Sequence, residues 1–290
     1  MQNRRDFLKQ ASLLLAGGLV APQLFSSCNA QGSGKYIGLQ LYSLREMVKD
    51  DGIQAVLEAV AKMGYKNLET ADGGKFYGMT AVELKKRMDD LGLKCTSAHI
   101  GGPAYSKEKE AEIMTWWDKA IEGHNELGVK YMVCPSMHVD ANTTLDDIKR
   151  MCDYFNTIGY KTAAAGIAFG YHNHAFEFRK IEDQLIYDYM LKNVSKNHVF
   201  FQLDVYWCQE GGYDPVEYLK KYADQIRTIH IKDEKEIGAS GKMNFQPIFE
   251  QMKANNIKDW YVEVEKYTNN NAVESVQQSI DYLKAAEYVY

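Results

Sequence analysis

Short apolar runs alternate with longer amphipathic segments from residue 36 to the C-terminus. Between the runs, apolar residues recur at spacings of three and four, as at Val273, Val276, Ile280 and Leu283, which is the period of a helix packed on one face. The runs themselves predict strands at residues 36–41, 66–69, 94–98, 131–134, 167–171, 200–204, 228–231 and 260–264. Strands that alternate with helices pair in parallel, and eight such units predict a closed (β/α)8 TIM barrel, an α/β fold.

The turn after the first strand argues against an open, doubly wound sheet. A nucleotide-binding sheet of that kind carries Gly-x-Gly-x-x-Gly at this turn, whereas residues 40–44 read Gln-Leu-Tyr-Ser-Leu. We therefore expect a single catalytic TIM-barrel domain that spans residues 36–290.

Several helix ends are marked by residues that start or terminate helices. Asp214-Pro215 is typical of an N-cap followed by proline in the first turn. Four glycines lie near the ends of helical patterns and are expected to adopt the left-handed C-cap conformation. They are Gly64, Gly92, Gly128 and Gly159.

Residues 1–30 differ from the rest of the chain and predict an export signal. The segment from Asn3 to Lys9 resembles the twin-arginine signal, with Arg4-Arg5 ahead of an apolar run at residues 11–20. That run has 10 residues, about half of what a membrane-spanning helix needs. We therefore expect a protein exported to the periplasm, with residues 31–35 as a short tether before the barrel.

The predicted signal has two possible ends. Phe25-Ser26-Ser27-Cys28 resembles a lipobox, in which Cys28 would become an acylated N-terminus, although Phe25 stands where leucine is usual. Alternatively, the small residues before Gln31 suit ordinary signal-peptide cleavage. We favour a lipid anchor at Cys28, which would be the only attachment to the membrane, and ordinary cleavage stays open.

The net charge and the lack of known nucleic-acid-binding motifs bear on the kind of partner that the protein binds. A formal net charge of -5 offers no extended basic surface to nucleic acid, and no zinc-finger spacing is present. We therefore expect a small-molecule partner, while the sequence leaves the oligomeric state undefined.

Cysteines and several histidines are expected to be structural or solvated. The cysteines beyond the signal are widely spaced, and we expect buried, unpaired thiols at Cys95, Cys134, Cys152 and Cys208. Three histidines in helix or loop contexts, which we expect to be solvated, are His124, His138 and His198.

Ionisable residues follow the last four predicted strands, at the end of the barrel where TIM-barrel active sites lie. These residues are His172 and His174, Asp204, His230 and Glu263. Carboxylates that face one barrel mouth repel each other unless a cation neutralises them. A mixed set of oxygen and nitrogen donors suits manganese, cobalt, zinc or magnesium, so we expect a divalent metal site.

The segments that carry these residues read GYHNHAFEF at 170–178, LDVYW at 203–207, HIKD at 230–233 and YVEVE at 261–265. They resemble the xylose-isomerase-like barrel family of sugar isomerases, epimerases and related lyases. The resemblance implies a metal held by glutamate, aspartate, histidine and glutamate from the fifth to eighth strands.

Three positions match the ligand set that the resemblance implies, namely Asp204, His230 and Glu263. The fifth strand departs from the pattern, because His172 stands where many members have glutamate. We take His172 as the fourth ligand, with Glu177 as the competing candidate.

Several polar and aromatic residues near the strand ends are candidates for contact with substrate. They are His99, His174, Trp207, Lys232 and Glu265. Structural alternatives stay open for three of them: His174 could orient a neighbouring ligand, Trp207 could belong to the core, and Glu265 could form a loop ion pair. Tyr42 and Arg45, after the first strand, are expected to close one wall of the site.

The candidate functions share one chemical step, removal of a proton next to a carbonyl. The resemblance favours a metal-dependent sugar isomerase or epimerase, with manganese as first choice of metal and Glu263, Glu177 or Glu69 as the base. Export, and the lack of a glycine loop that would cradle a phosphate, favour a non-phosphorylated sugar.

Two alternatives remain open. One is a lyase that removes the proton next to the ketone of a 3-keto-glycoside and expels the aglycone by β-elimination. It needs a single base, which agrees with the departure at His172. The other is a non-catalytic, exported sugar-binding barrel.

Overall fold

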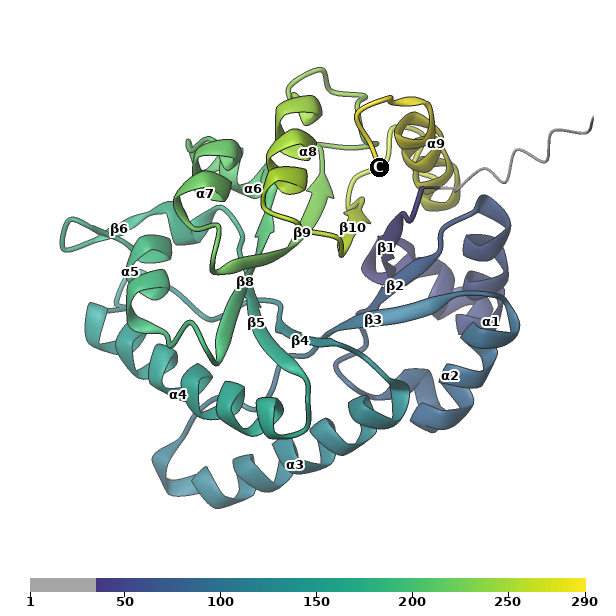
Figure 1. The fold of residues 1–290 in the computed structure, drawn as a ribbon. Coiled ribbons are helices and arrows are strands. Elements are labelled where there is room, and N and C mark those ends of the chain that lie inside the picture. Colours follow the sequence, from purple (N-terminus) through teal and green to yellow (C-terminus); the bar gives the residue numbers. More distant parts are fainter. Residues whose placement is uncertain (1–34) are drawn as a thin grey trace, which may run out of the picture. The chain divides into compact units, whose positions relative to one another are not determined.

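The computed structural model describes residues 35–290, which form a closed barrel of parallel strands surrounded by helices (Figure 1). Around the barrel the strands follow the order β1 (Gly38–Gln40), β10 (Trp260–Glu263), β9 (Ile226–Lys232), β8 (Val199–Asp204), β5 (Ala168–His172), β4 (Tyr131–Cys134), β3 (Lys94–His99) and β2 (Asn67–Thr70). Each predicted strand is present, and the predicted TIM barrel is confirmed.

The helices cover the outside of the barrel and bury the apolar faces that the sequence pattern predicts. They are α1 (Arg45–Met63), α2 (Ala81–Asp90), α3 (Glu110–Leu127), α4 (Leu145–Ala164), α5 (Ile186–Asn193), α6 (Val205–Glu210), α7 (Pro215–Lys221), α8 (Phe245–Ala254) and α9 (Ala272–Ala285). In α9, for example, Val276, Ile280 and Leu283 are fully buried. Burial of these stripes against the strands supplies the hydrophobic contribution to folding.

A small hairpin that the sequence pattern does not predict follows β5. Its strands are β6 (Lys180–Ile181) and β7 (Gln184–Leu185), which pair antiparallel. The turn residues Glu182 and Asp183 have φ values of 50° and 63°. A turn of this kind usually contains Asn-Gly or Asp-Gly, which can be recognised in the sequence. This turn contains Glu182-Asp183, so the sequence does not predict the hairpin.

Most of the predicted helix boundaries are confirmed. Gly64 and Gly128 end α1 and α3 in the left-handed conformation, and Gly92 follows α2 with a φ of 69°. Asp214 caps α7 by accepting a hydrogen bond from the backbone N–H of Val216, with Pro215 as the first helical residue.

Gly159 is not a C-cap, and that prediction is wrong. It lies inside α4, where an added Cβ would stand 2.2 Å from the carbonyl oxygen of His198. Close packing of the helix against the segment before β8 therefore selects glycine at this position. The left-handed glycine that follows α4 is Gly166, with a φ of 77°.

The observed burial matches the prediction for the four cysteines and differs from it for one histidine. Cys95, Cys134, Cys152 and Cys208 are buried free thiols, as expected. His124 is also buried, contrary to prediction, because its face of α3 packs under the segment after β2, where the Phe76 ring lies 5.1 Å away. His138 is exposed as predicted, and His198 is half-buried beside Tyr160.

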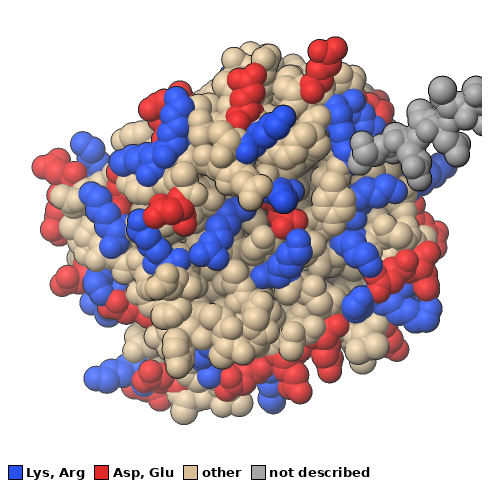
Figure 2. Space-filling model, viewed as in Figure 1, with Lys and Arg blue, Asp and Glu red and all other residues tan. Residues whose placement is uncertain are grey.

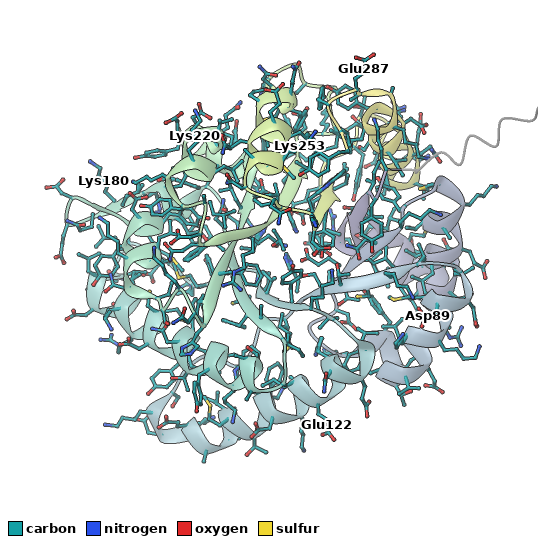
Figure 3. All side chains as sticks on the ribbon, in the orientation of Figure 1. Asp89, Glu122, Lys180, Lys220, Lys253 and Glu287 are labelled. Atoms are coloured by element: carbon teal, nitrogen blue, oxygen red, sulfur yellow. The ribbon has the colours of Figure 1, made fainter. Side chains whose placement is uncertain are left out.

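Charged side chains of both signs are interspersed on the molecular face in view (Figure 2). In Figure 3, Asp89, Glu122 and Lys220 lie on the outer helices, where water solvates them. The charged residues inside the barrel have no such solvation, and a buried charge is costly unless a partner compensates it.

The predicted signal and its lipidation candidate Cys28 lie outside the described residues. Lys35, the last residue of the predicted tether, is described, and its ammonium donates hydrogen bonds to the carbonyls of Leu283 and Lys284 in α9. Across residues 35–290, none of the helices is long and apolar enough to cross a bilayer.

The Gly159→Ala substitution is expected to destabilise the barrel by about 1–3 kcal/mol, because the new Cβ must displace the backbone near His198. Helix propensity alone predicts the opposite sign, a gain of about 1 kcal/mol. Urea unfolding decides between them, with Gly101→Ala as control because a Cβ there meets nothing within 4 Å. A Gly159→Ala protein as stable as the parent would contradict this account of the packing.

Candidate metal and active site

Four ionisable side chains from consecutive barrel strands converge at one point. They are His172 at the end of β5, Asp204 at the end of β8, His230 in β9 and Glu263 at the end of β10. One candidate ligand atom from each lies within 4.8 Å of the others, and all four residues are buried. This is the ligand set expected from sequence with His172, and a second group of His99, His172 and His230 overlaps it.

Two atoms of this group have no hydrogen-bond partner within the described protein. Asp204 caps α6 through Oδ1, which accepts the Trp207 N–H at 2.8 Å, while its buried Oδ2 is unpaired. Nδ1 of His172 is buried and unpaired as well. Burial raises the pKa of Asp204 to about 7 and lowers the pKa of His172 well below its usual value. Unpaired oxygen and nitrogen donors converging in a buried site fit a divalent cation.

His230 is held between two carboxylates. Its Nε2–H donates to Glu69 at 2.6 Å, and its Nδ1–H donates to Glu263 at 3.2 Å. Burial alone would lower the pKa of His230, but the two carboxylates raise it to about 10. Binding of a cation at Nδ1 would displace the proton there and leave the Nε2 hydrogen bond to Glu69, an arrangement common behind metal-binding histidines.

Glu69 supports His230 and other side chains and does not line the cavity. Besides His230, it accepts hydrogen bonds from Gln40 at 2.7 Å, Ser97 at 2.5 Å and Gln202 at 2.8 Å. Burial alone would raise its pKa, but His99 and His230 lower it to about 2. Glu69 is therefore an ionised anchor for its neighbours.

The neutral partners of Glu69 are site residues that sequence reasoning missed. Gln202 also accepts a hydrogen bond from His99 at 2.8 Å, which orients that ring toward the site. A signal was available for Gln202, since it lies two residues before Asp204 on the same strand and therefore on the same face. Gln40 and Ser97 have no comparable signal.

Lys232 is a buried cation beside Glu263. Its ammonium lies 3.1 Å from carboxylate oxygens of both Glu263 and Glu265, and 5.6 Å from the centre of the Trp207 ring. Burial alone would lower the pKa of Lys232, but Glu263 and its neighbouring carboxylates raise it. Lys232 therefore stays charged. It pairs with Glu263 at the end of β10 and with Glu265 two residues later.

A cavity of about 270 Å³ opens onto this group. Its described lining includes the ligand candidates His172 and Glu263 and the predicted substrate residues His99, His174 and Glu265. Further lining residues are Tyr42, Ala71, Gly73, Gly101, Pro135 and Ser136. Trp207 and Lys232 are not among the described lining residues. Trp207 lies next to His174, and Lys232 lies next to Glu265.

Of the two residues after β1 that were expected to close one wall, Tyr42 lines the cavity and Arg45 contacts Tyr42 from outside the lining. The Arg45 guanidinium stacks 4.5 Å from the centre of the Tyr42 ring. Arg45 also donates to the Glu265 carbonyl at 3.3 Å, which ties this wall to the segment after β10.

Glu177 is not brought into the candidate metal-binding group. Its carboxylate accepts hydrogen bonds from the Tyr171 hydroxyl at 2.5 Å and the His174 N–H at 2.8 Å. Tyr171 packs against Phe155 of α4, so Glu177 lies on the helix side of β5. Burial raises the pKa of Glu177 to about 8. The structure therefore leaves His172 as the fourth member of the group.

Comparison with known proteins identifies the family. A family model described as the xylose isomerase-like TIM barrel matches residues 57–286. The chain belongs to this family. A crystal structure of a sugar phosphate isomerase/epimerase from Parabacteroides distasonis ATCC 8503 is 40% identical, with a TM-score of 0.83, and covers 89% of this chain and 100% of that one.

Two more distantly similar proteins differ in their described activities. An inosose dehydratase of Geobacillus kaustophilus (strain HTA426) is 26% identical over 192 residues, or 61% of each chain, so this chain spans less than two thirds of that relative. A 3-keto-D-glucoside 4-epimerase from E. coli is 20% identical with a TM-score of 0.70, covers 87% of this chain and 100% of that one, and shares the fold.

The Glu69→Gln substitution is expected to weaken manganese binding by about 10- to 100-fold, because it removes the carboxylate that holds the His230 ring. Calorimetric titration of the metal-free protein with manganese measures the change. The exposed Glu274→Gln variant serves as control. Undiminished affinity in Glu69→Gln would show that Glu69 does not support the metal ligand.

Proposed function

We propose that this protein is a divalent-metal-dependent enzyme that moves a proton next to the carbonyl of a sugar, as an isomerase or epimerase. The observation that carries the proposal is the buried group of His172, Asp204, His230 and Glu263 at a cavity of about 270 Å³. When bound, a divalent cation would stabilise negative charge that develops on substrate oxygens, with manganese as first choice and magnesium, cobalt or zinc as alternatives.

Among the carboxylates considered as the base, Glu263 has the position that supports this role. It lines the cavity, whereas the carboxylates of Glu69 and Glu177 are enclosed by hydrogen-bond donors elsewhere. His174 is a second candidate acceptor, since burial lowers its pKa and its buried Nδ1 has no partner among the described residues. Two acceptors in one cavity support proton removal and return.

A second candidate reaction is β-elimination from a keto-sugar or keto-glycoside. The observation that favours it is His172 at a position where a second carboxylate would serve two-base epimerisation. An elimination also agrees with the relative described as a dehydratase. One group removes the proton next to the ketone, the C–H electron pair forms the double bond, and the leaving oxygen departs with its bonding pair and gains a proton.

The substrate is proposed to be a non-phosphorylated sugar or glycoside in the periplasm. Of the described residues that line the cavity, none is lysine or arginine, the usual partners of a phosphate group. The twin-arginine-like segment at residues 3–9 supports export, and Cys28 is the proposed site of a lipid anchor.

Incubation with manganese and keto-sugars in deuterium oxide is expected to place deuterium on the carbon next to the carbonyl. Isomerase and lyase both predict this exchange, and release of an aglycone from an oxidised glycoside selects the lyase. Saccharide binding with no exchange across a broad panel would support the non-catalytic barrel and reject both enzymes. Nuclear magnetic resonance spectroscopy detects all three results.

The Asp204→Asn substitution is expected to abolish manganese retention, measured by elemental analysis, without loss of folding. Asparagine can still cap α6 but lacks the anionic oxygen that is buried and unpaired in Asp204. Asp214→Asn is a matched control, because Asp214 caps α7 in the same way at an exposed position. Unchanged metal content in Asp204→Asn would reject Asp204 as a ligand.

A further inference from the structure

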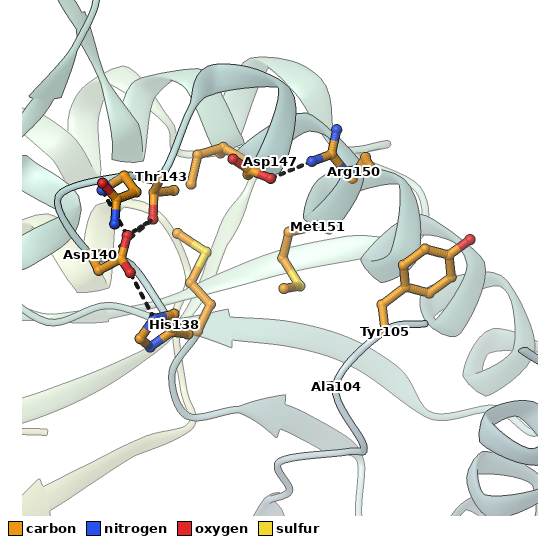
Figure 4. Close-up of a pocket in the computed structure, with 11 residues that line it drawn as sticks. Ala104, Tyr105, His138, Asp140, Thr143, Asp147, Arg150 and Met151 are labelled. Carbon is orange, nitrogen blue, oxygen red and sulfur yellow. Dashed lines mark hydrogen bonds and ion pairs between the residues drawn. The ribbon is translucent and has the colours of Figure 1, made fainter. Parts of the chain in front are cut away.

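A second, larger cavity lies along the same loops as the candidate active site (Figure 4). Its volume is about 420 Å³. The segment after β3 contributes Ala104 and Tyr105, the segment after β4 contributes Met137 and His138, and α4 contributes Met151. In Figure 4 the side chains of Tyr105 and His138 stand on opposite sides of the hollow, with Met151 between them.

The walls of the two cavities are continuous along the chain. Ser136 lines the inner cavity, and the next residue, Met137, lines the outer one. On the facing segment, Gly101 lines the inner cavity and Ala104 the outer one. Gly101 and Ser136 are small, and a Cβ added to Gly101 would meet nothing within 4 Å. The two cavities therefore share two wall segments, residues 101–104 and 136–137.

The outer cavity combines an apolar wall with hydrogen-bonding groups. Met137 and Met151 provide apolar surface, together with the half-exposed Tyr105 ring. That ring is backed by Tyr154 at 5.4 Å between ring centres, so its position is supported from behind.

The polar wall is formed by largely exposed side chains that contact one another. His138 lies 3.4 Å from the Asp140 carboxylate, which also accepts a hydrogen bond from the Thr143 hydroxyl at 3.1 Å. Arg150 and Asp147, which also line the cavity, pair with each other. A sugar ring presents C–H groups on its faces and hydroxyl groups around its edge, which matches an aromatic platform beside hydrogen-bonding side chains.

We propose that the outer cavity binds the second ring of a glycosidic substrate whose first ring occupies the inner cavity. The inner cavity, at about 270 Å³, is just below the usual range of small-molecule sites, about 300–1,000 Å³, and suits a single ring. This inference rests on the proposed function and names its substrate class, a two-ring glycoside in preference to a free monosaccharide.

The test compares two probes that differ by one ring, 3-keto-cellobiose and methyl 3-keto-β-D-glucoside, with the manganese-loaded protein. Calorimetry is expected to give a Kd at least about tenfold lower for the two-ring probe. Tyr105→Ala, which removes the aromatic platform, and Ala104→Trp, which fills the cavity, are each expected to remove this difference and to leave the Kd of the one-ring probe within about twofold. Tyr160→Ala is the matched control, since Tyr160 is 66% exposed on the outside of α4.

Each outcome decides the inference. Equal affinity of the parent protein for both probes, failure of both probes to bind, or a tenfold preference that survives both variants would overturn it. Deuterium exchange on the same samples separates this question from the proposed function. Exchange on the one-ring probe with no preference for the second ring rejects the outer subsite alone, whereas a ring-dependent Kd without exchange or product rejects the proposed reaction alone.

Discussion

The interior of this barrel depends on the pairing of buried charges between strands that are far apart in sequence. Glu69 of β2 and His230 of β9 are both fully buried and lie 2.6 Å apart. A lone charge at either place would be costly, and loss of one partner from such a pair typically costs about 3–5 kcal/mol. Because Glu263 and Lys232 extend the network, the same interactions support the fold and orient the candidate metal ligands.

The sequence predicts the barrel and some of the residues of the candidate site for a clear physical reason. Apolar periodicity indicates burial. The position of Asp204, His230 and Glu263 near the carboxyl ends of their predicted strands places them at one end of the barrel. Partners across the barrel are not accessible in this way. Gln202 of β8 and His230 of β9 reach Glu69 of β2 only because the closed barrel places their side chains in one interior.

Two wrong or incomplete expectations have the same origin. Glu177 is close in sequence to His174, but the turn after β5 directs its carboxylate behind the strand to Tyr171. Gly159 has the spacing of a helix end, but contact with the segment before β8 determines its identity. Local patterns describe elements well, whereas the contacts between elements decide the roles of individual residues.

Histidine stands at position 172, where the family resemblance leads us to expect glutamate, and this lowers the negative charge of the four converging groups. Asp204 and Glu263 are the only acids among the four converging groups, while burial favours a neutral His172. Two carboxylates would balance a dication, and the loaded group would carry no net charge. A set with a third carboxylate would be anionic and would repel the enolate of the proposed reaction. In the proposed reaction, four groups with no net charge would impose no such repulsion on the developing negative charge, and the Lys232 ammonium beside Glu263 would favour that charge.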